Sequence, residues 1–202
     1  NEEKFKGRML YISSSHVYGL VTDKKLPASE EMELKPRSPY AVSKVAAEAL
    51  CYQWSQTVGF DIVIARPFSH IGPGQSERFV VSDFAKQITE IKSGMRKPVL
   101  YVGDIDVTRD FTDVRDVVRA YQQLLENGKN GEVYNVCSGN EYSIRGLLQQ
   151  MIETAGVDAR IEQEKERLRP SEQRRVFGSY EKLYNETGWK PEIPIERTLE
   201  DI

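Results

Sequence analysis

Tyr40 and Lys44 are the two residues whose types and spacing most directly suggest chemistry. Ser38 is a preferred helix cap and Pro39 fits the first helical position, so we expect a helix to begin here with Tyr40 in its first turn. Residues four apart share one helix face, which points the Lys44 ammonium toward the Tyr40 phenol. The cation and the positive end of the helix dipole both favour phenolate, so Tyr40 is a candidate proton donor or acceptor. The spacing alone is more often a surface pair on an amphipathic helix.

A cluster of hydroxyl residues precedes this helix at the end of an expected strand. Residues 9–12 form a short apolar run that predicts a buried strand, and the sequence continues as SSSHVYG over residues 13–19. Open α/β sheets place their chemistry where strands end and lead through loops into helices. A Ser here could donate a hydrogen bond to a substrate carbonyl oxygen while Tyr40 delivers the proton. A Ser cluster alone is more often a solvated turn, but its combination with Tyr40 and Lys44 is far more specific.

Five stretches of the chain, in order, resemble the extended short-chain dehydrogenase/reductase family in its nucleotide-sugar-modifying branch. They are residues 13–19 (SSSHVYG), 38–44 (SPYAVSK), 66–75 (RPFSHIGPGQ), 109–117 (RDFTDVRDV) and 169–172 (RPSE). Residues 70–75 and 83–88 are similar, within that family, to the GDP-4-keto-6-deoxy-mannose reductases. The resemblance covers nearly the whole chain. It implies an α/β fold, the C-terminal portion of a Rossmann-type parallel sheet with an interleaved α+β substrate-binding lobe.

The resemblance implies three catalytic residues. Ser14 would bind the sugar O4, with Ser13 and Ser15 as substitutes if the strand end is shifted by one residue. Tyr40 would be the general acid that protonates the alkoxide formed when hydride reaches C4. Lys44 would favour the Tyr40 phenolate and hold the nicotinamide-ribose hydroxyls, so both residues also bind the cofactor.

Other residues are implied to line the cofactor and the sugar. Pro67 and Phe68 would run beside the nicotinamide. Ser69 stands where the family usually has an Asn that contacts the sugar nucleotide, and its shorter side chain has no amide. His16 departs from the related dehydratases, which carry at this position a Glu that abstracts the C5 proton. An imidazole could act as a base, but we interpret His16 as a loop side chain near the substrate, and the lack of Glu argues against dehydratase activity.

Two arginines and a glutamate are implied to hold the nucleotide diphosphate. Arg109 and Arg169 would lie near the pyrophosphate and Glu172 near the nucleotide ribose. A guanidinium suits phosphate oxygens because it can bind them in a bidentate manner. The alternative for any single arginine is a surface salt bridge, for example Arg109 with Asp113.

Composition restricts the class of protein. With 202 residues, 39% hydrophobic and 29% charged, the chain has the composition of an ordinary soluble protein with a sizeable core. A net charge of −3 gives no indication of a nucleic-acid partner. No apolar run approaches the ~20 residues that span a bilayer, and we expect a cytoplasmic protein. Cys51 and Cys137 lack metal-binding spacing, so we expect no metal and interpret both as reduced packing residues.

Strand and helix patterns alternate along much of the chain. We expect helices near residues 39–57, 79–93, 113–125, 143–155 and 180–186, and strands near 60–65, 98–102, 132–137 and 159–164. Residues 20–35 are polar and read as a surface loop. We assign residues 1–68 to the second half of the cofactor-binding domain. Residues 69–202 are mostly the substrate lobe, with about 113–138 returning to the sheet.

The Gly-rich turn that cradles a dinucleotide pyrophosphate does not occur in this sequence. By the resemblance the chain begins just before the fifth strand of the sheet, and about a hundred residues, one βαβαβ half, would precede it. We therefore expect this chain to be the C-terminal portion of a larger enzyme and to have little activity alone.

The resemblance implies an enzyme that reduces the C4 keto group of a nucleotide-linked 4-keto-6-deoxy sugar, converting GDP-4-keto-6-deoxy-D-mannose to GDP-D-rhamnose. The hydride would come from NADH or NADPH, because Tyr40 and Ser14 supply only a proton and orientation. The partners would be a GDP-linked sugar and a second copy in a homodimer. Three alternatives stay open: a nucleotide-sugar 4-epimerase, an enzyme like GDP-mannose 4,6-dehydratase, and a fragment that binds sugar nucleotide without turnover.

Overall fold

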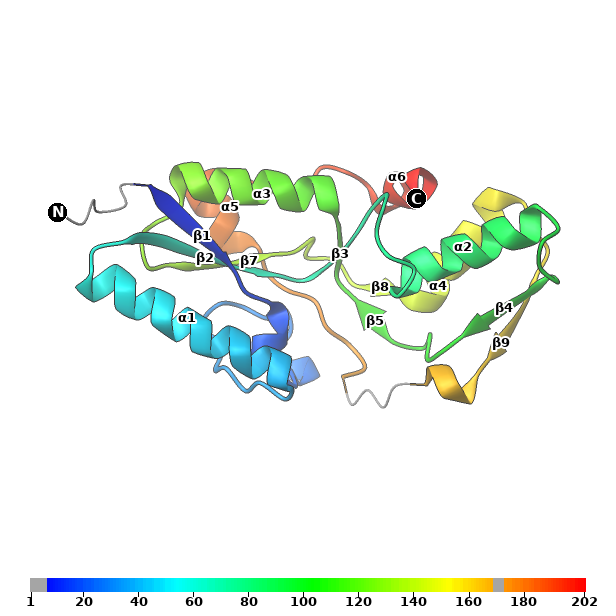
Figure 1. Cartoon of the computed structure of the whole chain (residues 1–202), viewed down its shortest axis with the longest axis horizontal. Coiled ribbons are helices and arrows are strands. Elements are labelled where there is room, and N and C mark those ends of the chain that lie inside the picture. The colour runs from blue at the N-terminus through cyan, green and yellow to red at the C-terminus, as the bar shows by residue number, and fades with distance from the viewer. Residues whose placement is uncertain (1–6, 169–172) are drawn as a thin grey trace.

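A three-stranded parallel sheet supports one end of the molecule (Figure 1). This computed structural model describes residues 7–168 and 173–202. The strand order is β1 (Arg8–Ile12), β2 (Asp61–Pro67) and β7 (Val133–Val136). Every residue of β2 after Asp61 is buried, as expected for a central parallel strand covered on both faces.

Helices cover both faces of this sheet. They are α1 (Pro39–Thr57) on one face and α3 (Val114–Asn127) with α5 (Glu181–Thr187) on the other. Val63 and Ala65 of β2 face α3, whereas Ile62 and Ile64 pack with Cys51 of α1. The alternation along β2 therefore builds two hydrophobic layers from one strand.

The register brings the strand ends to one edge of the sheet. Ile12 pairs with Ala65, and Pro67 pairs with Val136. Because the strands are parallel, the segments that follow them all leave at this carboxyl edge. The short 3-10 helix η1 (Ser15–Tyr18) follows β1 here, and α1 begins beside it.

The second part of the molecule lies at the other end of Figure 1. Its elements are α2 (Val80–Lys92), β4 (Val99–Val102), α4 (Ile144–Ala155), β9 (Arg160–Gln163), η3 (Lys165–Arg167) and α6 (Ile195–Asp201). Strands β4 and β9 pair in parallel, and α2 packs on α4 around Phe84 and Leu148. Two short strand pairs link the parts, β3 (Ser69–Ile71) with β6 (Phe111–Asp113) and β5 (Thr108–Arg109) with β8 (Tyr142–Ser143).

Most of the expected elements are confirmed within two residues of their ends, and both cysteines are buried and unpaired. The interpretation of residues 20–35 as a surface loop is wrong in part. This segment contains the 3-10 helix η2 (Asp23–Lys25), and it buries Val21 and Ala28. The reason is a distant contact, because Ala28 N donates to Phe177 O at 3.0 Å and Ala28 forms a parallel bridge with Gly178.

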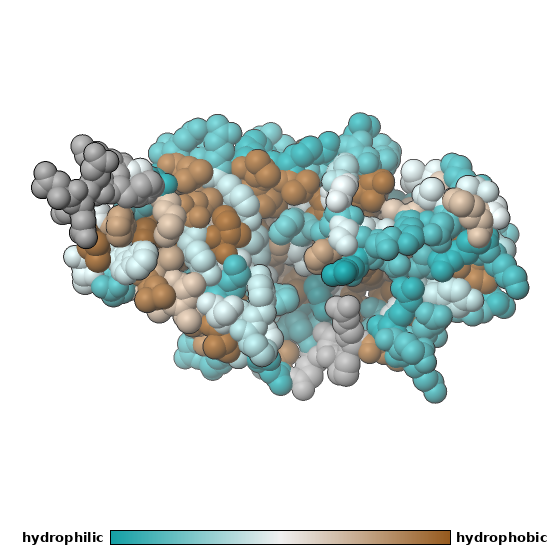
Figure 2. Space-filling view, viewed as in Figure 1, coloured by the Kyte–Doolittle hydropathy of each residue, from teal (hydrophilic) through white to brown (hydrophobic). Residues whose placement is uncertain are grey.

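Apolar side chains remain exposed near β1 and α1, where Figure 2 shows hydrophobic surface on the part of the molecule that carries the sheet. Leu50, Tyr52 and Trp54 of α1 are about half exposed, and so is Val118 of α3. Strand β1 has β2 on one side and no strand on its other side among the described residues. A helix that is apolar on more than one face is typically covered on both.

Candidate functional site

The first turn of α1 presents Tyr40 at the carboxyl edge of the sheet. Ser38 caps the helix, its hydroxyl accepting a hydrogen bond from Ala41 N at 3.1 Å, and Pro39 occupies the first turn. The predicted start of the helix is therefore confirmed. Tyr40 is 52% exposed, so its phenol is accessible to a small molecule.

Lys44 anchors this turn to the sheet. Its Nζ donates to Ile12 O, the last carbonyl of β1, at 2.8 Å. The same ammonium lies 5.6 Å from the centre of the Tyr40 ring and 5.2 Å from that of Tyr11. The expected pairing of Tyr40 and Lys44 on one helix face is confirmed, and the bond to Ile12 determines where that pair lies.

Ser14 lies between β1 and η1 and is 8% exposed. Its Oγ accepts from His16 N at 3.2 Å, which leaves the hydroxyl hydrogen able to donate to another group. Ser13 is also buried, and its Oγ has no hydrogen-bond partner among the described residues. The structure thus places two serine hydroxyls at this strand end. Ser14 is the one that caps η1, the helix whose His16 lies beside Tyr40.

His16 lies directly beside Tyr40. The two rings meet edge to face with their centres 6.1 Å apart. Desolvation by the surrounding chain, together with the positive charge of Arg109, lowers the pKa of His16. The imidazole is therefore neutral at pH 7, and it forms one wall next to the phenol.

Arg109 reaches this region from the other part of the molecule. It ends β5, and its Nη1 donates to Thr108 O at 2.6 Å and to Arg174 O at 3.5 Å. Burial, with a contribution from Arg174, lowers the pKa of Arg109. A partly desolvated guanidinium close enough to His16 to affect its titration brings an anion-binding group to the Tyr40 site.

Pro67, Phe68 and Ser69 leave the sheet between β1 and β7. The Phe68 ring is 4% exposed and lies 6.4 Å from the Tyr18 ring, so it packs inside the protein. Ser69 is exposed at the start of β3, and His70 Nδ1 lies 3.2 Å from Phe68 O. Only Ser69 of these three presents its side chain to solvent.

The predicted residues Arg169 and Glu172 lie outside the described residues. The chain is held immediately after them, because the Gln173 amide forms two hydrogen bonds with the backbone of Val21, at 2.8 and 2.9 Å. Thr108 N then donates to Arg174 O at 2.9 Å. This segment therefore runs between the loop after η1 and the strand that carries Arg109.

Two buried polar residues near the site were missed from sequence. Asp110, next to Arg109, accepts four hydrogen bonds, from Ser138 N and Oγ at 2.7 Å each, Gly139 N at 3.1 Å and Gly178 N at 3.2 Å. Arg66, at the end of β2, bonds Glu48 and Tyr18. Both residues belong to motifs noted in the sequence, RPF at residues 66–68 and RDF at 109–111. Those motifs do not indicate that the two side chains are buried.

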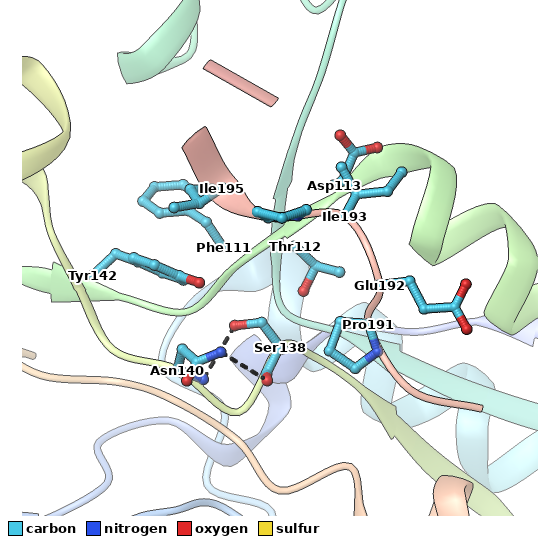
Figure 3. Close-up of a pocket in the computed structure, with 11 residues that line it drawn as sticks. Phe111, Thr112, Asp113, Ser138, Asn140, Tyr142, Pro191, Glu192, Ile193 and Ile195 are labelled. Carbon is cyan, nitrogen blue, oxygen red and sulfur yellow. Dashed lines mark hydrogen bonds between the residues drawn. The ribbon is translucent and has the colours of Figure 1, made fainter. Parts of the chain in front are cut away.

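Figure 3 shows a cavity of about 250 Å³ whose lining includes neither Tyr40 nor Lys44. It is lined by Phe111, Thr112, Ser138, Tyr142 and the 191–195 segment. Within the described ranges, no group of three or more His, Cys, Asp or Glu side chains is arranged to hold a metal ion. In those ranges there is also no helix long and apolar enough to cross a membrane.

Comparisons with known proteins agree on the family to which the chain is similar. The model of the family described as GDP-mannose 4,6 dehydratase matches residues 1–202. The chain is 52% identical over 198 residues to GDP-6-deoxy-D-mannose reductase of Pseudomonas aeruginosa, covering 98% of this chain and 65% of that protein. The chain therefore spans less than two thirds of that relative's length.

Solved structures give the same picture. The structure of RMD from Pseudomonas aeruginosa complexed with NADPH matches with a TM-score of 0.94 and 52% identity, over 98% of this chain and 66% of that chain. A UDP-glucuronic acid 4-epimerase from Bacillus cereus, in complex with UDP-glucuronic acid and NAD, matches with a TM-score of 0.82 and 29% identity. The match covers 96% of this chain and 59% of the epimerase.

Proposed function

Because this chain belongs to the GDP-mannose 4,6 dehydratase family, within the extended short-chain dehydrogenases/reductases, we propose that its protein reduces GDP-4-keto-6-deoxy-D-mannose to GDP-D-rhamnose. The observation that carries the proposal is the 52% identity with GDP-6-deoxy-D-mannose reductase. The grouping of Ser14, His16, Tyr40 and Lys44 at one sheet edge supports it, because these residues can orient and protonate a sugar carbonyl.

The contacts at this edge support a role for each residue. When bound, a reduced nicotinamide would supply hydride to C4 of the sugar, and the oxygen on C4 would then need a proton. Tyr40 gives that proton from its exposed phenol, and Ser14 donates its remaining hydroxyl hydrogen to the same oxygen. Lys44 holds the first turn of α1 through its bond to Ile12 O.

The described residues fit the nicotinamide-ribose end of NADH or NADPH. Lys44 Nζ has three hydrogens, and Ile12 O is its one hydrogen-bond acceptor among the described residues. Two donors can therefore meet ribose hydroxyls beside Tyr40. Pro67 and Phe68 leave the sheet at the same edge, and because both side chains are buried we propose that they run alongside the nicotinamide through their backbone.

The substrate would extend from Tyr40 toward Arg109. We propose that Arg109 and Arg169 bind the pyrophosphate and Glu172 the ribose. Arg109 supports this part best, because its guanidinium is partly desolvated and lies near His16. His16 would contact the sugar without transferring a proton, and a neutral imidazole agrees with that role. A dehydratase would need a base at this position, so we propose reduction in place of water loss.

An epimerase is the second candidate, favoured by the 0.82 TM-score to UDP-glucuronic acid 4-epimerase. In an epimerase the cofactor is oxidised and re-reduced within one turnover, so none is consumed. Incubating the gene product that contains this chain with GDP-4-keto-6-deoxy-D-mannose and NADPH separates the two. We expect loss of NADPH absorbance in step with GDP-D-rhamnose formation. No loss of NADPH absorbance, together with interconversion of GDP-D-rhamnose and its C4 epimer without net cofactor consumption, would contradict the reductase proposal and support the epimerase.

The variant Tyr40→Phe tests the proton donor. We expect kcat to fall by about 10²–10⁴-fold, the usual contribution of general acid catalysis, with little change in KM for either substrate. Tyr52→Phe is a matched control, since Tyr52 is a comparably exposed tyrosine three turns further along α1. An equal loss in both variants would contradict the assignment of Tyr40.

We also propose two domains. Residues 1–68, together with about 113–138, form part of the cofactor-binding domain, and most of residues 69–202 form the substrate-binding lobe. A homodimer is supported by the exposed apolar side chains Leu50, Tyr52 and Trp54 of α1, and light scattering would test it. The need for reduced nicotinamide suggests the cytoplasm.

The 202-residue chain expressed by itself is expected to bind GDP without turnover, because the Gly-rich turn that cradles a dinucleotide pyrophosphate does not occur in it. We also expect it to be poorly stable, because its β1 edge is unpaired within the described ranges. Titrations with GDP and with NADPH test this expectation. Tight NADPH binding together with a sharp two-state melt would contradict it.

A further inference from the structure

A buried arginine joins the two elements that carry the proposed site. Arg66 is 4% exposed, and its guanidinium binds Glu48 of α1 twice, Nε to Oε1 at 3.0 Å and Nη2 to Oε2 at 2.6 Å. Its third nitrogen, Nη1, donates to the hydroxyl of Tyr18 in η1 at 3.1 Å. A bidentate pair restricts both distance and orientation. One side chain of β2 therefore holds α1 and η1 together.

Tyr18 extends the network to the neighbouring strand. Its hydroxyl donates to Asn135 Oδ1 of β7 at 2.6 Å, and Asn135 Nδ2 donates to Ala28 O at 3.0 Å. Tyr18 and Asn135 are 2% and 0% exposed. Burial raises the pKa of Tyr18 to about 12, so the hydroxyl keeps its hydrogen at neutral pH. The position of η1 is thus set by a satisfied hydrogen-bond chain that crosses two strands.

The helix geometry connects this network with Tyr40. Tyr40, Lys44 and Glu48 follow at four-residue spacing and so lie on one face of α1. Lys44 fixes this face to the end of β1 through Ile12 O, and Glu48 fixes it to β2 through Arg66. Two attachment points on one face determine both the rotation of the helix about its axis and its position along the sheet.

We propose that Arg66 is a positioning residue that sets the separation between Tyr40, at the start of α1, and Ser14, at the start of η1. Glu48 and Tyr18 are its two side-chain attachments, and its Nη1 also donates to the backbone carbonyl of Glu30 at 3.4 Å. The inference rests on the proposed reductase function, because it is for proton transfer to one substrate oxygen that the two hydroxyls must be held together. Arg66, Glu48 and Tyr18 are all buried, so their role is to hold other residues in place.

Stability alone is a poor account of this network. Burying an ion pair costs desolvation energy, and apolar side chains of similar size often serve as well where only stability is needed. A bidentate pair has a fixed geometry that apolar packing lacks. The network joins α1, which carries Tyr40, to η1, which Ser14 caps, and a fixed geometry between these two residues matters to the reaction.

The test measures kcat and KM of Glu48→Gln, Tyr18→Phe and the double variant in the gene product that contains this chain, with NADPH and GDP-4-keto-6-deoxy-D-mannose. We expect each single change to lower kcat by about tenfold to a hundredfold, as small displacements of reacting groups do, with KM within about twofold. Because the two attachments act in series through Arg66, breaking the second adds little. The kcat of the double variant is expected to lie within about threefold of the kcat of the less active single variant.

Losses that multiply in the double variant, or that appear in KM alone, would overturn the proposal. Tyr134→Phe is the matched control, because it also removes the phenol hydroxyl of a buried tyrosine, bonded to Glu186, and the Tyr134 side chain packs with α3 and α5 on the sheet face away from α1. It should lower the melting temperature and leave kcat unchanged. An equal fall of kcat in this control would show that lost stability explains the effect. Arg66→Lys retains the charge without the bidentate geometry and is expected to resemble the single variants.

Amide hydrogen exchange gives a readout that does not depend on turnover. Arg66 links Glu48 to Tyr18 of η1 by hydrogen bonds, so Glu48→Gln should speed exchange of the 15–19 amides. Unchanged exchange there would overturn the positioning role. Absence of NADPH consumption by the wild-type protein would instead refute the proposed function, while the exchange result would still decide whether α1 and η1 are coupled.

Discussion

Replacing Asp110 with Asn is expected to destabilise the protein out of proportion to so small a change. Asp110 is fully buried, and each carboxylate oxygen accepts two hydrogen bonds. Its donors come from the loop after β7 and from Gly178, in a segment that also holds Ala28. The carboxylate thus joins parts of the chain that are far apart in sequence, next to Arg109.

The magnitude follows from counting donors. An amide has one acceptor oxygen and one NH₂ group, so in either orientation its NH₂ faces two donors. In the better orientation it faces Ser138, whose hydroxyl can turn and accept while the Ser138 N–H loses its partner. An orphaned buried donor costs about 1–3 kcal/mol, and the surviving bonds lose the strength that an ionised acceptor adds.

One effect acts in the opposite direction. Burial raises the pKa of Asp110, and its donors offset only part of that rise. The ionised form therefore carries a burial cost that the neutral amide avoids. The net loss is expected to be about 2–4 kcal/mol, or a fall of about 4–16 °C in melting temperature for a domain of this size.

Thermal denaturation followed by circular dichroism measures this effect. Asp158→Asn is the control, because it makes the same chemical change at an exposed position in the turn after α4 and should alter stability by less than about 0.5 kcal/mol. A melting temperature for Asp110→Asn that equals that of the control would refute the reasoning, since the four hydrogen bonds would then contribute nothing.

Three further outcomes are expected. Gly178→Ala places a Cβ 2.5 Å from Phe68 Cζ, so overpacking should cost about 1–3 kcal/mol in a denaturation experiment, whereas Gly146→Ala, in an exposed turn of α4, should not destabilise. Burial alone would raise the pKa of Asp113, but bonds from Arg115 and Thr198 outweigh it and lower that pKa. The ionised carboxylate then stabilises the fold above about pH 4 and loses this effect as the pH falls. The loss of unfolding free energy caused by Thr198→Val should therefore shrink in acid, because Thr198 donates to this carboxylate. A loss that does not vary with pH would contradict this. His16→Gln should keep kcat within about threefold of wild type, and a loss of a hundredfold or more would assign His16 a proton-transfer role.

The local elements of the site could be predicted because their signals lie within a few residues. Ser38 and Pro39 start α1 where the capping rules place it, and four-residue spacing brings Lys44 over the Tyr40 ring. The apolar run of β2 predicts its burial on both faces. These features depend on backbone geometry, which repeats along any helix or strand.

Other features could not be predicted because their partners are distant in sequence. Residues 20–35 look like a polar loop, yet Ala28 is buried by a backbone bridge to Gly178. Arg66 belongs to a motif of the resemblance with no role assigned from sequence, yet it is buried and bonded to Glu48 and Tyr18. The hydrophobic periodicity of the sequence does not indicate such contacts, since they arise when separate elements pack together.

The sequence by itself therefore determined the parts of this protein: a capped helix with Tyr40 and Lys44, a strand that ends in serines, and motifs that resemble one enzyme family. Tertiary structure alone decided how those parts meet. The parallel register brings the ends of β1, β2 and β7 to one edge, and packing between the two parts carries Arg109 to His16. The physical reason is that helix and strand geometry depends on neighbouring residues, whereas burial and charge pairing depend on groups that only the folded chain brings together.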